Sequence, residues 1–139
     1  MGDAAGVGPE IVLRAWAGGE LGDGIVVYGD VAILRAGATR LGLDIDWTSF
    51  PLVDLGLLTA EQLRPGVLDA ACGAAARAYV ERATIDALAG GVAGLVTLPM
   101  NKEATQLTDP SFVGHTEFIA QLCGVQKVSM MLTAPLPGS

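Results

Sequence analysis

The sequence is poor in cysteine, histidine and basic side chains. Its 139 residues include two cysteines, one histidine, and eight lysines and arginines against fifteen aspartates and glutamates. Cys72 and Cys123 lack the Cys-x-x-Cys spacing of a redox or zinc site, and we expect both to be buried free thiols. The net charge of −7, with scattered basic residues, argues against binding to nucleic acid or to an anionic membrane.

Long apolar runs are also missing. The apolar stretches are far shorter than the roughly 20 residues that a membrane-spanning helix needs. No basic segment followed by an apolar one, as in a secretion signal, opens the chain, so we expect a cytoplasmic protein. With 51% hydrophobic residues, the composition is typical of one globular unit.

Short apolar runs rich in β-branched residues alternate with segments of helical period. We predict strands at 24–29, 45–50, 92–97 and 127–132, and helices at 9–17, 30–41 and 115–124. A short helical turn is expected at 60–63, and a long alanine-rich helix at about 66–88. This alternation predicts an α/β fold with a mostly parallel sheet and flanking helices.

Both ends of the chain differ from those of a complete α/β domain. The chain opens on a glycine-rich loop, residues 2–10, which in such folds normally follows a strand. It closes on turn-forming residues, 134–139, directly after a predicted strand. We therefore expect residues 1–139 to be an incomplete fold, the N-terminal fragment of a larger protein.

The N-terminal loop has two interpretations. Gly2, Gly6 and Gly8 permit positive φ angles and close backbone approach, and the start of the following helix presents N–H groups that suit an anion. The glycine spacing matches neither the dinucleotide-binding nor the P-loop pattern. A tight turn that leads into a helix is therefore the favoured interpretation.

The remaining polar groups concentrate in two clusters. Thr97, Asn101 and Lys102 follow the best candidate for a central strand, where parallel sheets usually bind ligands. Asn101 and Lys102 suit equally well the start of a helix, as cap and solvated side chain. His115 begins the last predicted helix, where it either contacts a ligand or donates to a backbone carbonyl, and Glu117 in the first turn complements the helix dipole.

Three motifs, in order along the chain, identify a family. Residues 2–10 resemble the Gly-Asp-Pro-Ala-Gly-Ile-Gly-Pro-Glu opening of the 4-hydroxythreonine-4-phosphate dehydrogenases of pyridoxal phosphate biosynthesis, with Ala4 in place of the proline. Residues 97–104 resemble their Thr-x-Pro-x-Asn-Lys-Glu-Ala segment, and residues 114–117 their Gly-His-Thr-Glu. The resemblance spans essentially the whole chain, but the chain covers less than half of a family member.

The resemblance implies a homodimeric dehydrogenase that uses NAD or NADP and has the two-domain fold of isocitrate and isopropylmalate dehydrogenases. A divalent metal would assist the oxidation of a phosphorylated hydroxy acid, such as 4-hydroxythreonine 4-phosphate, and the decarboxylation that follows. It also implies that His115 and Thr116 contact the substrate. We add Asn101 and Lys102 as candidates for further substrate contacts.

The resemblance places the metal-binding histidines of the family beyond this chain. We therefore expect no metal site in it, and no catalysis by these 139 residues alone. Family relatives that act on phosphothreonate or phosphoerythronate share the same framework, so the exact substrate stays open. Two other classes also stay open, namely an acyl transferase like phosphate acetyltransferase, which would depend on coenzyme A, and a noncatalytic remnant that dimerises or binds a partner.

Overall fold

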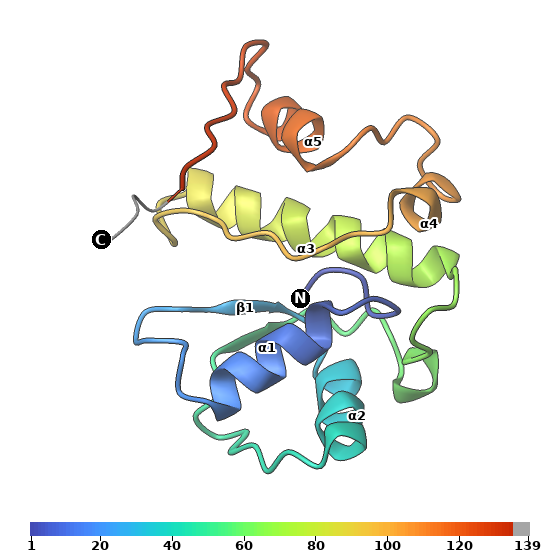
Figure 1. The fold of residues 1–139 in the computed structure, drawn as a ribbon. Coiled ribbons are helices and arrows are strands. Elements are labelled where there is room, and N and C mark those ends of the chain that lie inside the picture. The colour runs from blue at the N-terminus through green and yellow to red at the C-terminus, as the bar shows by residue number, and fades with distance from the viewer. Residues whose placement is uncertain (135–139) are drawn as a thin grey trace.

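Helix α3 (Ala70–Leu88) is the element on which the others are arranged. In the computed structural model, which describes residues 1–134, it crosses the middle of the molecule (Figure 1). On one side lie α1 (Gly8–Ala17), α2 (Val31–Leu41) and strands β1 (Val27–Gly29) and β2 (Leu52–Asp54), and on the other lie α4 (Lys102–Gln106) and α5 (His115–Leu122). A short 3-10 helix, η1 (Ala60–Gln62), precedes α3. The arrangement is an α/β fold, as predicted.

The sheet of residues 1–134 consists of two parallel strands. Val27 lies opposite Leu52, and Gly29 opposite Asp54. The backbone N–H of Val27 donates to the carbonyl of Pro51 at 2.7 Å, and that of Leu55 donates to the carbonyl of Gly29 at 2.9 Å. The first predicted strand is thus confirmed over its second half, and its parallel pairing agrees with the predicted fold class.

The other three predicted strands are not found as strands in the described part of the chain. Residues 45–50 contain a turn, because the Asp46 carboxylate accepts hydrogen bonds from the backbone N–H of Thr48 at 2.9 Å and from its hydroxyl at 2.6 Å. The chain therefore joins the sheet only at Leu52. Segments 92–97 and 127–132 join no ladder, because no strand within residues 1–134 pairs with them.

The predicted helices are confirmed, with shifted ends. Helix α3 begins four residues later than predicted, because the Asp69 carboxylate caps it by accepting from the N–H groups of Ala71 and Cys72 at 2.8 and 3.0 Å. Helix α5 ends at Leu122, and Gly124 follows with a left-handed φ of 67°. Among residues 1–134, no helix is both long and apolar enough to cross a membrane.

Asp30 connects the sheet to α3. Its carboxylate is completely buried and accepts hydrogen bonds from the backbone N–H of Leu57 and from the hydroxyl of Tyr79. Asp30 directly precedes α2, but its carboxylate makes no cap bond, and Asp54 accepts from the Val31 N–H at 3.1 Å instead. Because a buried carboxylate is tolerated only with such partners, these bonds tie β1, the chain after β2, and α3 together.

The two cysteines differ in environment. Cys72 is buried in the main apolar core, which is built around Leu13, Ile33 and Leu34, and burial raises the pKa of its thiol to about 11. Cys123 is exposed, so its predicted burial is wrong. The reason is that α5 buries only Phe118, and Cys123 follows the last turn of that helix on the side of the solvent.

Helix α4 packs against α3 at a glycine. A Cβ atom added to Gly73 would lie 2.3 Å from the carbonyl carbon of Ala104 and 2.4 Å from its oxygen. The buried hydroxyl of Thr105 donates to the carbonyl of Asn101 at 3.0 Å and lies 3.4 Å from that of Gly73. The position of α4 therefore depends on the absence of a side chain at residue 73.

We predict that Gly73→Ala destabilises the chain. The new methyl group would overlap backbone atoms of α4, and relief of such overpacking costs about 1–3 kcal/mol. Chemical denaturation would measure this as a lower free energy of unfolding. Gly22→Ala is the matched control, because a Cβ there meets nothing within 4 Å. Equal stability of the two variants would contradict the packing described here.

Candidate functional site

The N-terminal loop lies against the segment that precedes α4. The backbone N–H of Asp3 donates to the carbonyl of Pro99 at 3.1 Å. Gly2 has a positive φ of 74°, and a Cβ atom there would lie 2.6 Å from the same carbonyl oxygen. Only glycine fits this position without displacement of the backbone. The first two motifs are therefore in direct contact in the fold.

The loop itself is a tight turn, as favoured from the sequence. Two of its amides are engaged within the loop, because the Asp3 carboxylate accepts from the Ala5 N–H at 2.8 Å and the Asp3 carbonyl accepts from the Gly6 N–H at 3.0 Å. Gly8, the first residue of α1, packs so closely that an added Cβ would lie 2.0 Å from the carbonyl oxygen of Met1. These amides are consequently not presented to an anion.

Asp3 is a further residue of the candidate site, and it was not predicted from the sequence. Its side chain is buried, and burial raises the pKa of its carboxyl, although the backbone N–H groups of Ala5 and Asn101 favour the charged form. The carboxylate thus links the loop to the first residue before α4. An acidic side chain in an otherwise apolar, glycine-rich loop was the available signal in the sequence.

Asn101 and Lys102 lie at the start of α4. The side-chain oxygen of Asn101 accepts from the Ala104 N–H at 3.0 Å, which confirms the interpretation of Asn101 as a helix cap. Lys102 is exposed. It takes part in none of the ion pairs found within residues 1–134. The ammonium group of Lys102 is therefore accessible to an anionic ligand.

His115 and Thr116 form the first turn of α5, which is held on α3 by aromatic and ionic contacts. The ring of Phe118 packs edge-on against Phe112, with centroids 5.8 Å apart. The guanidinium carbon of Arg77 lies 4.4 Å from the centroid of the Phe118 ring. Arg77 also donates through Nε to the Asp109 carboxylate at 3.1 Å. Arg77 therefore fixes both α5 and the loop before it.

The Nε2 atom of His115 is buried and has no hydrogen-bond partner within residues 1–134. Burial lowers the pKa of its imidazole, so the ring is neutral at pH 7. A buried nitrogen without a partner costs about 1–3 kcal/mol, which a hydrogen bond to a ligand would recover. Thr116 is partly exposed beside it, and Glu117 occupies the first helical turn, as predicted.

The structure places the four predicted residues in two pairs. The pair on α4 and the pair on α5 both lie on helices that contact α3, on the same side of it (Figure 1). Within residues 1–134, no hydrogen bond or ion pair connects Asn101 or Lys102 to His115 or Thr116. The described residues also contain no group of three or more His, Cys, Asp or Glu side chains that could hold a metal ion.

Comparisons with known proteins agree with the motifs. The sequence model of the family described as pyridoxal phosphate biosynthetic protein PdxA matches residues 22–136. The chain is 35% identical over 150 residues to the D-threonate 4-phosphate dehydrogenase of Cupriavidus necator, covering 97% of this chain and 45% of the relative. It is 36% identical over 140 residues to the 4-hydroxythreonine-4-phosphate dehydrogenase of Maricaulis maris, covering 88% and 41%.

Solved structures give the same result. The chain resembles a 4-hydroxythreonine-4-phosphate dehydrogenase from Burkholderia phymatum with a TM-score of 0.86 and 36% identity, over 97% of this chain and 45% of that one. The corresponding enzyme from Klebsiella pneumoniae gives a TM-score of 0.78 and 36% identity, over 88% and 42%. The chain thus spans less than half the length of these relatives, all of which are named dehydrogenases rather than acyl transferases.

We predict that the imidazole of His115 titrates below the ordinary pKa of 6.5, because burial disfavours its charged form. Since His115 is the only histidine, one proton resonance in an NMR titration reports this pKa. The unfolded chain binds more protons below pH 6.5, so the free energy of unfolding should also fall as the pH drops below that value. A midpoint at or above 6.5 would contradict the burial of the ring.

Proposed function

We propose that this chain, which belongs to the PdxA family of pyridoxal phosphate biosynthetic proteins, forms the substrate-binding part of a dehydrogenase. The substrate would be a phosphorylated hydroxy acid, such as 4-hydroxythreonine 4-phosphate or D-threonate 4-phosphate. The observation that carries the proposal is the unpaired Nε2 of His115, in the motif Gly114 to Glu117 at the start of α5. A carboxylate or phosphate oxygen supplies the partner that this nitrogen lacks.

Charge supports the same assignment. The chain carries a net charge of −7, so a phosphorylated acid needs a local cation to bind. Lys102 offers an accessible ammonium group at the start of α4. Thr116 adds a hydroxyl beside His115, and the side-chain NH₂ of Asn101 adds a donor next to Lys102. In this proposal, the two pairs hold opposite ends of one substrate.

The whole protein would be a homodimer with the two-domain fold of isocitrate and isopropylmalate dehydrogenases, and it would transfer hydride to NAD or NADP. Decarboxylation of the resulting β-keto acid would follow. The divalent metal that the family implies does not fit residues 1–134, which lack a sufficient group of ligands. We therefore assign its ligands, and the chemistry at the hydroxyl, to parts of the enzyme outside this chain.

We predict that Lys102→Gln weakens the binding of 4-hydroxythreonine 4-phosphate by about tenfold to a hundredfold, because a charge-assisted hydrogen bond contributes roughly 1.5–3 kcal/mol. His115→Gln, which replaces the ring N–H by a side-chain amide, should weaken it as well. Calorimetric titration measures both effects. Lys127→Gln is the matched control, because Lys127 is exposed in a segment outside the site and should leave the affinity unchanged.

Equal effects of the two lysine changes would show that Lys102 acts only through net charge, and would remove it from the site. Comparison with D-threonate 4-phosphate distinguishes the two substrates named by the relatives. The purified chain of 139 residues should bind without forming NADH. Turnover by this chain alone would contradict the assignment of the metal ligands and the chemistry to parts of the enzyme outside it.

A further inference from the structure

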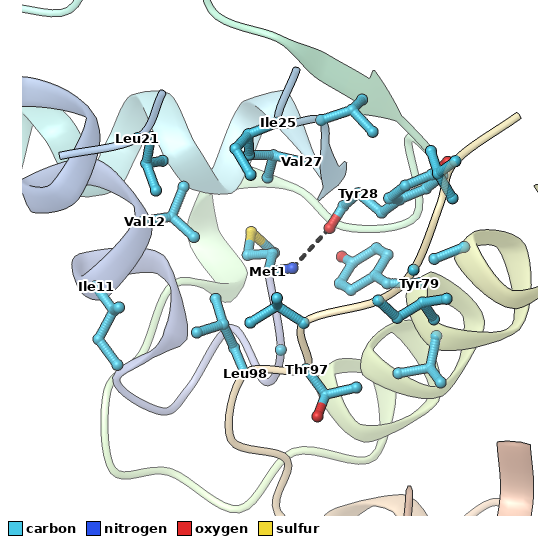
Figure 2. Close-up of a pocket in the computed structure, with 18 of the residues that line it drawn as sticks. Met1, Ile11, Val12, Leu21, Ile25, Val27, Tyr28, Tyr79, Thr97 and Leu98 are labelled. Carbon is cyan, nitrogen blue, oxygen red and sulfur yellow. Dashed lines mark hydrogen bonds between the residues drawn. The ribbon is translucent and has the colours of Figure 1, made fainter. Parts of the chain in front are cut away.

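Opposite faces of α3 serve different parts of the molecule. Tyr79 lines an apolar cleft beside β1, where Figure 2 shows its ring near Met1 and Tyr28. Arg77 lies two residues earlier, and because a helix turns by about 100° per residue, its side chain leaves the opposite face. Helices α4 and α5 contact α3 on that side (Figure 1). Arg77 therefore faces the elements that carry both pairs of predicted site residues.

Helix α5 is held on α3 mainly through one ring. It spans eight residues, and isolated helices shorter than about 12–15 residues are marginal in water. Among its residues only Phe118 is buried, whereas Ile119 and Leu122 are partly buried in the same apolar cluster. His115 lies three residues before Phe118 and thus on the same face of the helix. The contacts of the Phe118 ring therefore also determine where the imidazole lies.

Three contacts hold the guanidinium group of Arg77 over that ring. Its Nε donates to the Asp109 carboxylate at 3.1 Å, and its Nη1 donates to the Glu81 carboxylate at 3.3 Å. Its central carbon lies 4.4 Å from the centroid of the Phe118 ring, which is a cation–π contact. Because two carboxylates engage different nitrogens of one planar group, the group cannot turn freely above the ring.

Asp109 belongs to the loop that joins α4 to α5. Its backbone N–H donates to the carbonyl of Thr105 in α4 at 3.0 Å. Its carboxylate accepts from the N–H of Ser111 at 3.2 Å and from the hydroxyl at 2.6 Å. Asp109 is thus fixed relative to α4. Since Arg77 binds both Asp109 and the Phe118 ring, it determines how far the pair on α5 lies from the pair on α4.

We propose that Arg77 is a positioning residue for substrate binding, which touches no substrate but holds His115 and Thr116 in place relative to the pair on α4. As regards the substrate, this inference rests on the proposed function. Without Arg77, α5 leaves α3 in a fraction of the molecules. Those molecules cannot offer both pairs to one ligand, so the apparent affinity falls with the fraction that remains competent.

The test uses two variants with opposite changes of charge. Arg77→Met removes a positive charge and the cation–π contact, and Asp109→Asn removes a negative charge and weakens the bond that orients the guanidinium. Both should weaken the binding of 4-hydroxythreonine 4-phosphate in calorimetric titration, by about tenfold and about threefold respectively. In both, the pKa of His115 measured by NMR should rise toward 6.5, because the released ring is less buried.

A purely electrostatic role of Arg77 predicts opposite signs for the two variants. Loss of the Arg77 charge would weaken anion binding and raise the pKa of His115, whereas loss of the Asp109 charge would strengthen binding and lower that pKa. Such opposite shifts would overturn the proposal. An unchanged affinity or an unchanged pKa in Arg77→Met would also overturn it.

Arg82→Met is the matched control. Arg82 lies on the same helix and also pairs with a carboxylate four residues later, but this partner, Asp86, accepts from Tyr28 of β1, away from α5. Both the affinity and the pKa of His115 should stay unchanged. If the unaltered chain binds neither 4-hydroxythreonine 4-phosphate nor D-threonate 4-phosphate, the proposed function is contradicted, whereas the titration of His115 still decides whether Arg77 positions its ring.

Arg77→Lys keeps the inference testable if Arg77→Met does not fold. The lysine keeps the charge but lacks the planar group that bonds to two carboxylates and stacks on Phe118. It should therefore restore only part of the affinity and of the low pKa of His115. Values equal to those of the unaltered chain would show that a positive charge alone suffices, and would overturn the proposal.

Discussion

The contact between residues 1–3 and Pro99 is the constraint on which the rest of the site depends. It brings two segments that are far apart in the chain within one hydrogen bond, 3.1 Å from the N–H of Asp3 to the carbonyl of Pro99. Gly2 is required because a Cβ would overlap that carbonyl, and Gly8 because α1 starts against Met1. Once the loop is held there, the buried carboxylate of Asp3 reaches the backbone at Asn101, where α4 begins.

Helix α3 contacts both the helix that follows Asn101 and the helix that carries His115 and Thr116. Gly73 allows α4 to approach it at backbone distance, and Arg77, one turn further along, binds Asp109 and stacks on Phe118. Both pairs of predicted site residues thus belong to segments that pack against α3. The neutral imidazole of His115 and the accessible ammonium group of Lys102 support the binding of a phosphorylated acid proposed above. The metal chemistry of the proposed reaction requires ligands that residues 1–134 do not group together.

The helices could be predicted from the sequence because their signals are local. Periodicity placed them to within a few residues, and the start of α3 was misplaced only because Asp69 was not recognised as its cap. A strand requires a partner strand, and segments 92–97 and 127–132 pair with none within residues 1–134. The prediction for 45–50 failed for a local reason, because the side chain of Asp46 stabilises a turn. The motif around His115 was visible in the sequence. The burial of its Nε2 and the packing of Arg77 on Phe118 arise only from tertiary structure.

Residue-resolved amide hydrogen exchange of the 139-residue chain, measured by NMR, tests most directly whether the first two motifs assemble as described. The account predicts slow exchange at Asp3 and Ala5, whose N–H groups donate to the Pro99 carbonyl and the Asp3 carboxylate. Val96, which is 92% exposed and has no backbone partner within residues 1–134, provides the fast reference in the same spectrum. Exchange at Asp3 as fast as at Val96 would show that the loop is not held against Pro99, and would contradict the account.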